Sequence, residues 1–382
     1  MQSTFDVAVV GAGVFGAWAA YQIRRTGASV LLVDQYGAGN SRASSGGETR
    51  MIRLGYGTDE IYSRSAQRSL LFWRDLCKQT GQSLFQHTGV LWLAHEGDPY
   101  PINTLATLTK IGAVFQKLTR SEVEQRYPQI RFDEIAWAIL EPESGVLMAR
   151  RAVRALVKQA QADGVRYLHD SVLPPEGSGR LAAISLASGM EISARQLVFA
   201  CGPWLPKVFP QVLGELIHVT RQEVFFIGTP AGDSRFGPQQ MPACIDFTDL
   251  VYGLPDIEGR CFKVAIDAHG ADFDPDNDAR TSSKEGLSAV RERLKRRVPA
   301  LAEAPVLETR VCQYENTSNG DFLIDRHPAF ENVWLVGGGS GHGFKHGPVV
   351  GEYVAGVVSG KVKVEPRFAL AAKHRVQQRQ VY

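Results

Sequence analysis

Three glycines and one aspartate have the spacing of a dinucleotide-binding unit near the start of the chain. Gly11, Gly13 and Gly16 follow an apolar run at residues 7–10, and Asp34 follows a second apolar run. In such units the first glycine permits a tight turn, the second lets the backbone approach a pyrophosphate, and the third lets the next helix pack closely. A carboxylate at Asp34 would accept hydrogen bonds from a ribose and repel a 2′-phosphate, which favours FAD or NAD over NADP. The alternative is a glycine-rich turn in an ordinary α/β protein.

A second glycine-rich segment lies near the end of the chain. Six of the eleven residues from 337 to 347 are glycine, between an apolar run at residues 333–336 and a helical pattern that Pro348 is suited to begin. Glycine at that density lets a flat ring lie against the backbone, and a helix start directs N–H groups and partial positive charge at it. A reduced flavin carries negative charge on its pyrimidine side, which such a loop would stabilise. The alternative is a flexible surface loop.

Size and composition are those of a globular protein large enough for two domains. Forty-two basic residues against forty acidic ones leave a net charge of +2, which argues against nucleic acid or an anionic membrane as partner. The longest largely apolar stretch, residues 7–21, is shorter than a membrane helix and has no basic residue ahead of it, so we expect neither a membrane span nor a signal peptide. Five cysteines without CxxC spacing argue against a disulfide framework or a zinc site and favour a cytoplasmic location.

The periodicity of apolar residues predicts an α/β protein with the following elements. Helices are expected at residues 14–26, 61–80, 120–126, 149–164, 284–296 and 349–358, the third opened by Thr119 or Ser121 as cap. Strands are expected at residues 7–10, 29–33, 165–168, 196–200, 219–227, 250–254, 260–266 and 333–336. Three separated segments, 1–83, 148–215 and 314–382, would form a cofactor domain. Two insertions, 84–147 and 216–313, would form a substrate domain on a mostly antiparallel sheet.

These features and a series of short blocks together resemble one family. The blocks are GAGVFG at 11–16, GETRMIR at 47–53 followed by Tyr56, FACGPW at 199–204, YGLP at 252–255, Phe262 with Lys263, VCQY at 311–314 followed by FLID at 322–325, and GHGFK at 341–345. Over essentially its whole length the chain resembles the D-amino-acid-oxidase-type flavoproteins, most of all their monomeric sarcosine oxidase and N-methyltryptophan oxidase branch. The resemblance implies a glutathione-reductase-like FAD-binding Rossmann domain and an α+β substrate domain.

The resemblance implies a role for each of five pocket residues. Arg53 matches the residue that grips the substrate carboxylate, Lys345 matches the second cation on it, and Tyr252 would line the pocket. Arg50 would lie near the flavin, and Lys263 would lie over it and promote reaction with oxygen. A guanidinium suits a carboxylate because its planar fork binds both oxygens. Without the resemblance, solvated arginines and a lysine whose head reaches solvent at a sheet edge would be the default interpretation.

The resemblance also implies how FAD is held. Cys312 matches the position that carries FAD through a thioether in this branch, and a thiolate is the nucleophile that such a bond needs. The alternative is a small buried apolar residue. The expected cofactor contacts are Gly11, Gly13, Val14, Phe15, Gly16, Asp34, Arg42, Ser44, Thr49, Arg50, Val172, Cys201, Gly202, Trp204, Cys312, Gly339, Gly341, His342, Gly343, Phe344 and Lys345.

Two positions depart from the branch. Residues 315–319 read Glu-Asn-Thr-Ser-Asn where a turn containing Thr and Pro is usual. Asp267 stands where sarcosine oxidase has a histidine near the substrate, and His269 follows two residues later. The second departure lies in the expected substrate pocket, and it argues against sarcosine itself as the best substrate.

The resulting hypothesis is an oxidase that acts on the C–N bond of a secondary amine bearing a carboxylate, such as an N-methyl amino acid or a cyclic amino acid like proline or pipecolate. The amine would bind unprotonated, so no general base is assigned, and His342 and His269 would only tune the site. The products would be an imine and, with O2 as acceptor, hydrogen peroxide, and we expect a monomer.

Three alternatives stay open. A dehydrogenase of the same fold would pass electrons to a quinone or carrier protein, and the presence of Lys263 favours the oxidase over it. A non-catalytic FAD-binding subunit would need no pocket cations, whereas Arg53 and Lys345 are present. An NAD-linked Rossmann enzyme would leave the second glycine-rich segment and Cys312 without a role.

Overall fold

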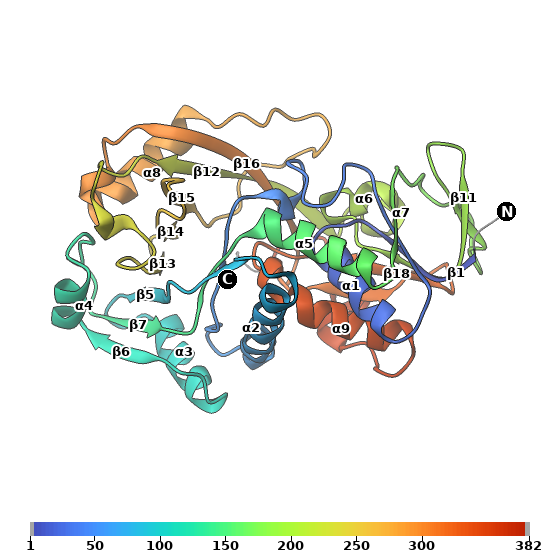
Figure 1. Cartoon of the computed structure of the whole chain (residues 1–382), viewed down its shortest axis with the longest axis horizontal. Coiled ribbons are helices and arrows are strands. Elements are labelled where there is room, and N and C mark those ends of the chain that lie inside the picture. Colours follow the sequence, from blue (N-terminus) through green and yellow to red (C-terminus); the bar gives the residue numbers. More distant parts are fainter. Residues whose placement is uncertain (1–3, 379–382) are drawn as a thin grey trace.

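Figure 1 shows the computed structural model of the protein, which describes residues 4–378. A seven-stranded sheet forms the right-hand part of this view. The strand order is β17, β18, β11, β1, β2, β9, with β10 paired to β11. Neighbouring strands from β18 to β9 are parallel. Strand β17 pairs antiparallel with β18, and β10 pairs antiparallel with β11. The strands are β1 (Thr4–Val10), β2 (Val30–Asp34), β9 (Arg166–His169), β10 (Ala183–Ser185), β11 (Glu191–Phe199), β17 (Leu323–Arg326) and β18 (Val333–Gly337).

Helices cover both faces of this sheet because its central strands bury side chains on both sides. Val7 and Val9 of β1 belong to one apolar core, and Ala8 and Val10 belong to another. The first core includes α1 (Val14–Arg25), α2 (Glu60–Thr80), α5 (Ala149–Ala162) and α9 (Gly347–Val358). The second includes the short helices α6 (Leu205–Val208) and α7 (Pro210–Leu213). This is the doubly wound arrangement that binds dinucleotides.

An eight-stranded sheet forms the left-hand part of Figure 1. Its order is β16, β12, β15, β14, β13, β5, β7, β6, and in the described residues each neighbouring pair is antiparallel except β13 with β5. The strands are β5 (Val90–Ala94), β6 (Gln116–Thr119), β7 (Trp137–Glu141), β12 (Ile217–Ile227), β13 (Ala243–Asp246), β14 (Val251–Leu254), β15 (Phe262–Ile266) and β16 (Val306–Thr317). The helices of this part are α3 (Pro99–Lys110), α4 (Arg120–Arg126) and α8 (Lys284–Arg297). The predicted mostly antiparallel sheet is confirmed.

Smaller elements join the two parts. A three-stranded sheet consists of β3 (Arg50–Ile52), β8 (Gly145–Leu147) and β4 (Phe85–Gln86). The predicted domain border between residues 313 and 314 falls inside β16, which pairs with β12 without a break from residue 308 to 317. The division into domains stays a prediction. In residues 4–378 no helix combines the length and the apolar character that a membrane crossing requires.

Most predicted elements are confirmed within a few residues. The helix at 120–126 is confirmed with Thr119 as its cap, because the Glu122 carboxylate and the Thr119 hydroxyl each accept from the other's backbone N–H. The helix α3 was not predicted. Its threonines are weak helix formers and give no clear apolar stripe, and it begins instead from an Asp98 side chain that caps the Tyr100 N–H.

Candidate active site

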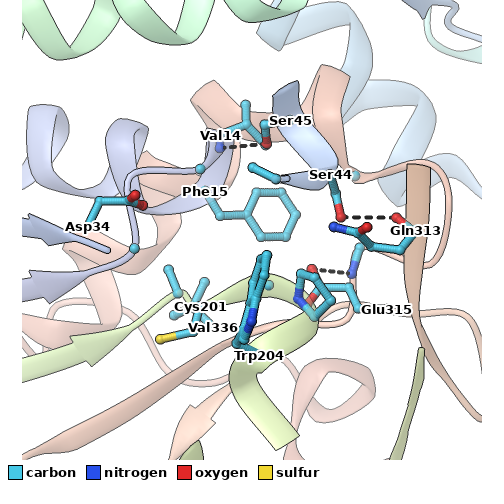
Figure 2. A pocket seen from close by; sticks show the side chains of 18 of the residues that line it. Val14, Phe15, Asp34, Ser44, Ser45, Cys201, Trp204, Gln313, Glu315 and Val336 are labelled. Carbon is cyan, nitrogen blue, oxygen red and sulfur yellow. Dashed lines mark hydrogen bonds between the residues drawn. The ribbon is translucent and has the colours of Figure 1, made fainter. Parts of the chain in front are cut away.

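The larger of two adjoining cavities runs along the carboxyl ends of β1, β2, β11 and β18. It contains about 1210 Å³ of empty space, its open mouth included. In Figure 2 Asp34 lies at one end of the view and Gln313 and Glu315 lie at the other, with Phe15 and Trp204 between them. An elongated cleft at this edge of a doubly wound sheet is where dinucleotides bind.

The turn after β1 has the backbone that the glycine motif predicts. Gly11 has a φ of +103°, and a Cβ there would lie 2.3 Å from the Ala200 carbonyl oxygen. A Cβ on Gly16 would lie 1.9 Å from the Gly11 carbonyl oxygen, so only glycine lets α1 begin this close to β1. The Asp34 carboxylate accepts a hydrogen bond of 2.7 Å from the Ala12 N–H, which ties the second strand to this turn.

The second cavity, of about 800 Å³ with its open space included, adjoins the first. The two share Arg50, Cys312, Tyr314, Gly341 and Phe344 as lining residues. A flat ring at this shared wall would therefore touch both spaces. The other lining residues of the second cavity are Met51, Arg53, Gln222, Val224, Ile245, Tyr252, Lys263, Ala265, Ile266, Asp267, His342 and Lys345.

Arg53 and Lys345 bring two buried basic side chains to the second cavity, each about one-twentieth exposed. The Arg53 guanidinium donates to the Gly55 carbonyl and lies over the Tyr56 ring, 4.3 Å from its centroid. The Lys345 ammonium donates to the Tyr56 hydroxyl (2.7 Å) and to the His342 carbonyl (2.9 Å). Burial, and then the charge of Arg53, hold the pKa of Lys345 well below its usual range. Among residues 4–378 neither cation has a carboxylate oxygen within 4.0 Å, so both are poised to receive an anion.

Two further basic side chains lie close together, Arg50 at the wall between the cavities and Lys263 in the second cavity. Lys263, from β15, and Arg50 each donate to the Thr49 carbonyl oxygen at 2.8 Å. Arg50 also approaches the Cys312 sulfur at 3.3 Å. Burial, and then the charge of Arg50, hold the pKa of Lys263 well below its usual range. The Arg50 guanidinium and the Cys312 sulfur therefore lie in contact at the shared wall.

The second cavity also contains one carboxylate. Asp267 follows β15, and its Oδ1 accepts a hydrogen bond of 3.0 Å from the Tyr314 hydroxyl. Burial raises the pKa of Asp267, while the Tyr314 hydrogen bond and the charges of Arg53 and Lys345 act in the opposite direction. Burial also raises the pKa of Tyr252, which keeps that phenol neutral.

One unsatisfied carboxylate oxygen and the glycine-rich segment of the larger cavity fit FAD. Glu315 is 9% exposed, and its Oε1 accepts from the Gly339 N–H at 3.2 Å. Its Oε2 is buried and has no partner within residues 4–378. A hydroxyl-bearing group in the cavity, such as the sugar portions of FAD carry, would supply the missing donor. The glycine-rich segment adds backbone at Gly339, Gly341 and Gly343, against which a flat ring can lie.

Comparison with known proteins agrees with this geometry. Residues 6–357 match the FAD dependent oxidoreductase family, and the chain belongs to that family. Over 368 residues it is 32% identical to monomeric sarcosine oxidase of Bacillus sp. (strain B-0618), covering 93% of this chain and 92% of the relative. It is 26% identical over 356 residues to N-methyl-L-tryptophan oxidase of Yersinia pestis (strain Pestoides F), covering 92% and 94%. The predicted resemblance to this branch is confirmed.

A solved structure shows the same fold. L-proline dehydrogenase from P. horikoshii superposes with a TM-score of 0.83 at 21% identity, covering 97% of this chain and 98% of that one. The predicted fold class, an FAD-binding Rossmann domain with a substrate domain, is confirmed.

The structure places the predicted site residues in two groups. The second cavity is lined by all of the predicted catalytic residues, which are Arg50, Arg53, Tyr252, Lys263 and Lys345. The larger cavity is lined by most of the predicted cofactor residues: Gly11, Gly13, Val14, Phe15, Asp34, Ser44, Arg50, Val172, Cys201, Gly202, Trp204, Cys312, Gly339, Gly341, Gly343 and Phe344.

Five predicted cofactor residues lie outside the lining of the larger cavity. His342 and Lys345 line the second cavity, and Gly16 packs behind the turn. The Thr49 carbonyl receives the hydrogen bonds described above, and Arg42 donates to backbone carbonyls at residues 275–276. His269, which was predicted to tune the site, is also absent from the residues that line either cavity.

Some cavity residues were not predicted from the sequence. Ser45 accepts a hydrogen bond of 3.0 Å from the Val14 N–H at the start of α1, and no local pattern links residues 31 positions apart. Tyr314 was detectable, because alternation along β16 places it on the same side as Cys312. Cys312 and Tyr314 line both cavities, whereas Ser45, Gln313 and Glu315 line only the larger one.

Replacing Glu315 with Gln should remove a pH dependence from the stability of the flavin-free protein. Burial raises the pKa of Glu315 from its ordinary 4.5 to about 7, so the folded protein keeps this proton to a higher pH than the unfolded chain. The contribution of Glu315 to the free energy of unfolding is therefore greatest below pH 4.5. As the pH rises towards 7, the free energy of unfolding falls by roughly 3 kcal/mol. Urea unfolding at pH 5 and pH 8 measures this loss, which should be smaller in the variant. An equal loss in both proteins would contradict the assignment.

Proposed function

We propose that the protein oxidises the C–N bond of a secondary amine that carries a carboxylate, an N-methyl or cyclic amino acid, to an imine. The observation that carries the proposal is the pair of buried cations, Arg53 and Lys345, in a cavity that shares a wall with the cofactor cavity. FAD, when bound, supplies the acceptor for the electrons and hydrogen that leave the substrate. The names of the relatives, sarcosine oxidase and N-methyl-L-tryptophan oxidase, support this substrate class.

The chain's own residues bind and orient the substrate. The Arg53 guanidinium lies over the rings of Tyr56, Trp92 and Phe247, with centroids at 4.3, 5.0 and 5.1 Å, which holds its planar fork in one orientation. A carboxylate bound to this fork and to the Lys345 ammonium has its neighbouring C–N bond fixed relative to the shared wall. The aromatic rings also exclude water, which strengthens both charge interactions.

Dioxygen is the proposed electron acceptor, with hydrogen peroxide as product. The support is the buried Lys263 side chain, which lines the second cavity and shares the Thr49 carbonyl with Arg50 of the shared wall, because a cation held there stabilises negative charge that develops on oxygen. We also propose that Cys312 carries FAD covalently, supported by its place in both cavities and by Arg50 beside its sulfur. A monomeric and cytoplasmic protein is proposed from the balanced charge and the five free cysteines.

Matched pairs of amines test the proposed reaction. N-methylglycine, proline and pipecolate are compared with dimethylamine, pyrrolidine and piperidine, which lack the carboxylate, and hydrogen peroxide is measured in air. The amino acids should give peroxide and the plain amines far less. Substrate-dependent reduction of a quinone dye without peroxide would instead favour the dehydrogenase. Equal rates with and without the carboxylate would contradict the proposal.

Replacing Cys312 with Ser should release the flavin from acid-precipitated protein, because a hydroxyl does not form the thioether. The wild-type precipitate should stay yellow and the variant precipitate should be colourless, with FAD in the supernatant. Cys201→Ser is the matched control, since Cys201 lines the same cavity and burial raises its pKa. Complete release of flavin from the wild-type protein would rule out the covalent bond.

A further inference from the structure

Asp267 is a fixed carboxylate within the proposed substrate cavity. Its backbone N–H donates to the Leu250 carbonyl at 2.7 Å, and Leu250 has a φ of +52°, in the left-handed region that favours glycine. Its Oδ1 accepts from the Tyr314 hydroxyl at 3.0 Å. The first contact fixes the backbone of Asp267 and the second fixes its carboxylate, although sequence reasoning assigned this residue no role.

The cavity has opposite charges on separate groups. Arg53 and Lys345 are basic, Asp267 is acidic, and all three line the same space. Within the described residues no nitrogen of Arg53 or Lys345 lies within 4.0 Å of the Asp267 carboxylate. Asp267 therefore forms no ion pair with Arg53 or Lys345. The phenols of Tyr252 and Tyr314 are the other titratable groups that face Asp267.

An amino acid near neutral pH carries the complementary pattern, a carboxylate and an ammonium a short distance apart. We propose that the Asp267 carboxylate is the counter-ion of the substrate ammonium, so that the cavity selects zwitterionic amino acids over carboxylic acids that lack the nitrogen. The inference rests on the proposed function. It adds Asp267, which would bind the amine, to Arg53 and Lys345, which would bind the carboxylate. Burial of Asp267 strengthens the attraction, because water screens it less.

This inference changes the expected form of the bound substrate. The sequence hypothesis has the amine arriving unprotonated, with nothing in the chain assigned to meet its charge. With Asp267 present, the protonated amine binds first, and its proton can pass to the carboxylate, which leaves a neutral amine and a neutral carboxyl group. Burial raises the pKa of Asp267, which is the direction that such a proton acceptor needs.

A pair of isosteric ligands tests the inference by binding alone. N-methylglycine and butanoate differ in that an ammonium nitrogen replaces one methylene. The holoenzyme is reduced chemically without oxygen, so that neither ligand is consumed, and both dissociation constants are measured by calorimetry. The wild-type protein should bind N-methylglycine at least about tenfold more tightly than butanoate. Asp267→Asn should remove or reverse this preference, while Asp272→Asn, which removes an exposed carboxylate, should keep it.

Each outcome decides the inference separately from the proposed function. A wild-type protein without the preference overturns the inference, even if Asp267→Asn does not fold. An unchanged ratio in Asp267→Asn overturns it as well. If N-methylglycine reduces the flavin while the ratio stays unchanged, the inference fails and the proposed function stands. If no amino acid reduces the flavin but the preference for N-methylglycine depends on Asp267, the proposed function fails and the role of Asp267 in binding the ammonium stands.

Discussion

Replacing Lys263 with Met should slow reoxidation of the reduced protein by air by about a hundredfold or more, with anaerobic reduction nearly unchanged. Methionine keeps the unbranched side chain as far as Cε and removes the charged nitrogen. Lys263 is 3% exposed and its ammonium is hydrogen bonded to the Thr49 carbonyl, so bulk water screens this charge little. Its pKa is low because of burial and Arg50, and negative charge that develops beside it favours its protonated form.

Stopped-flow measurement of the two half-reactions separates these effects. Reduction is followed by loss of flavin absorption under nitrogen, and reoxidation is followed after mixing with aerated buffer. Lys207→Met is the matched control, because Lys207 pairs with Asp274 and Asp276 at the surface. Its two rates should equal those of the wild-type protein. Equal slowing of both half-reactions in Lys263→Met would contradict the role given to Lys263.

Replacing Arg53 with Ala should weaken the binding of carboxylate ligands by about a hundredfold. The change removes one of two buried cations and leaves Lys345 as the sole partner of the substrate carboxylate. Arg53→Lys should recover part of the affinity, because the charge returns without the planar fork. Butanoate affinity, measured by the change in flavin absorption, reports the effect without turnover. An unchanged affinity in Arg53→Ala would mean that the carboxylate binds elsewhere.

The dinucleotide unit was predictable because each of its parts is local. The apolar run, the glycines and Asp34 follow one another within one βαβ unit, and the backbone at Gly11 leaves no choice of residue. The helix α3 was missed because its sequence is rich in threonine and its start depends on the Asp98 cap. Propensity alone does not detect such a helix.

The two cavities could be predicted only in part, because their walls join distant segments. Arg50 of β3 and Cys312 of β16 meet at 3.3 Å, and only the family resemblance connected them beforehand. Asp267 and Glu315 were noticed as departures from the branch, but their roles depend on partners and burial that a sequence does not contain. Arg42 was placed at the cofactor from the resemblance, and that contact stays a prediction; its side chain bonds to carbonyls at residues 275–276.

Anaerobic titration of the purified protein with N-methylglycine, proline and pipecolate decides whether this site oxidises amino acids at its flavin. The absorption of the oxidised flavin is recorded as each compound is added in the absence of oxygen. At least one of them should bleach the flavin fully at close to one equivalent, and admission of air should restore the colour. A protein without flavin, or a flavin that none of these compounds reduces, would contradict the proposed function.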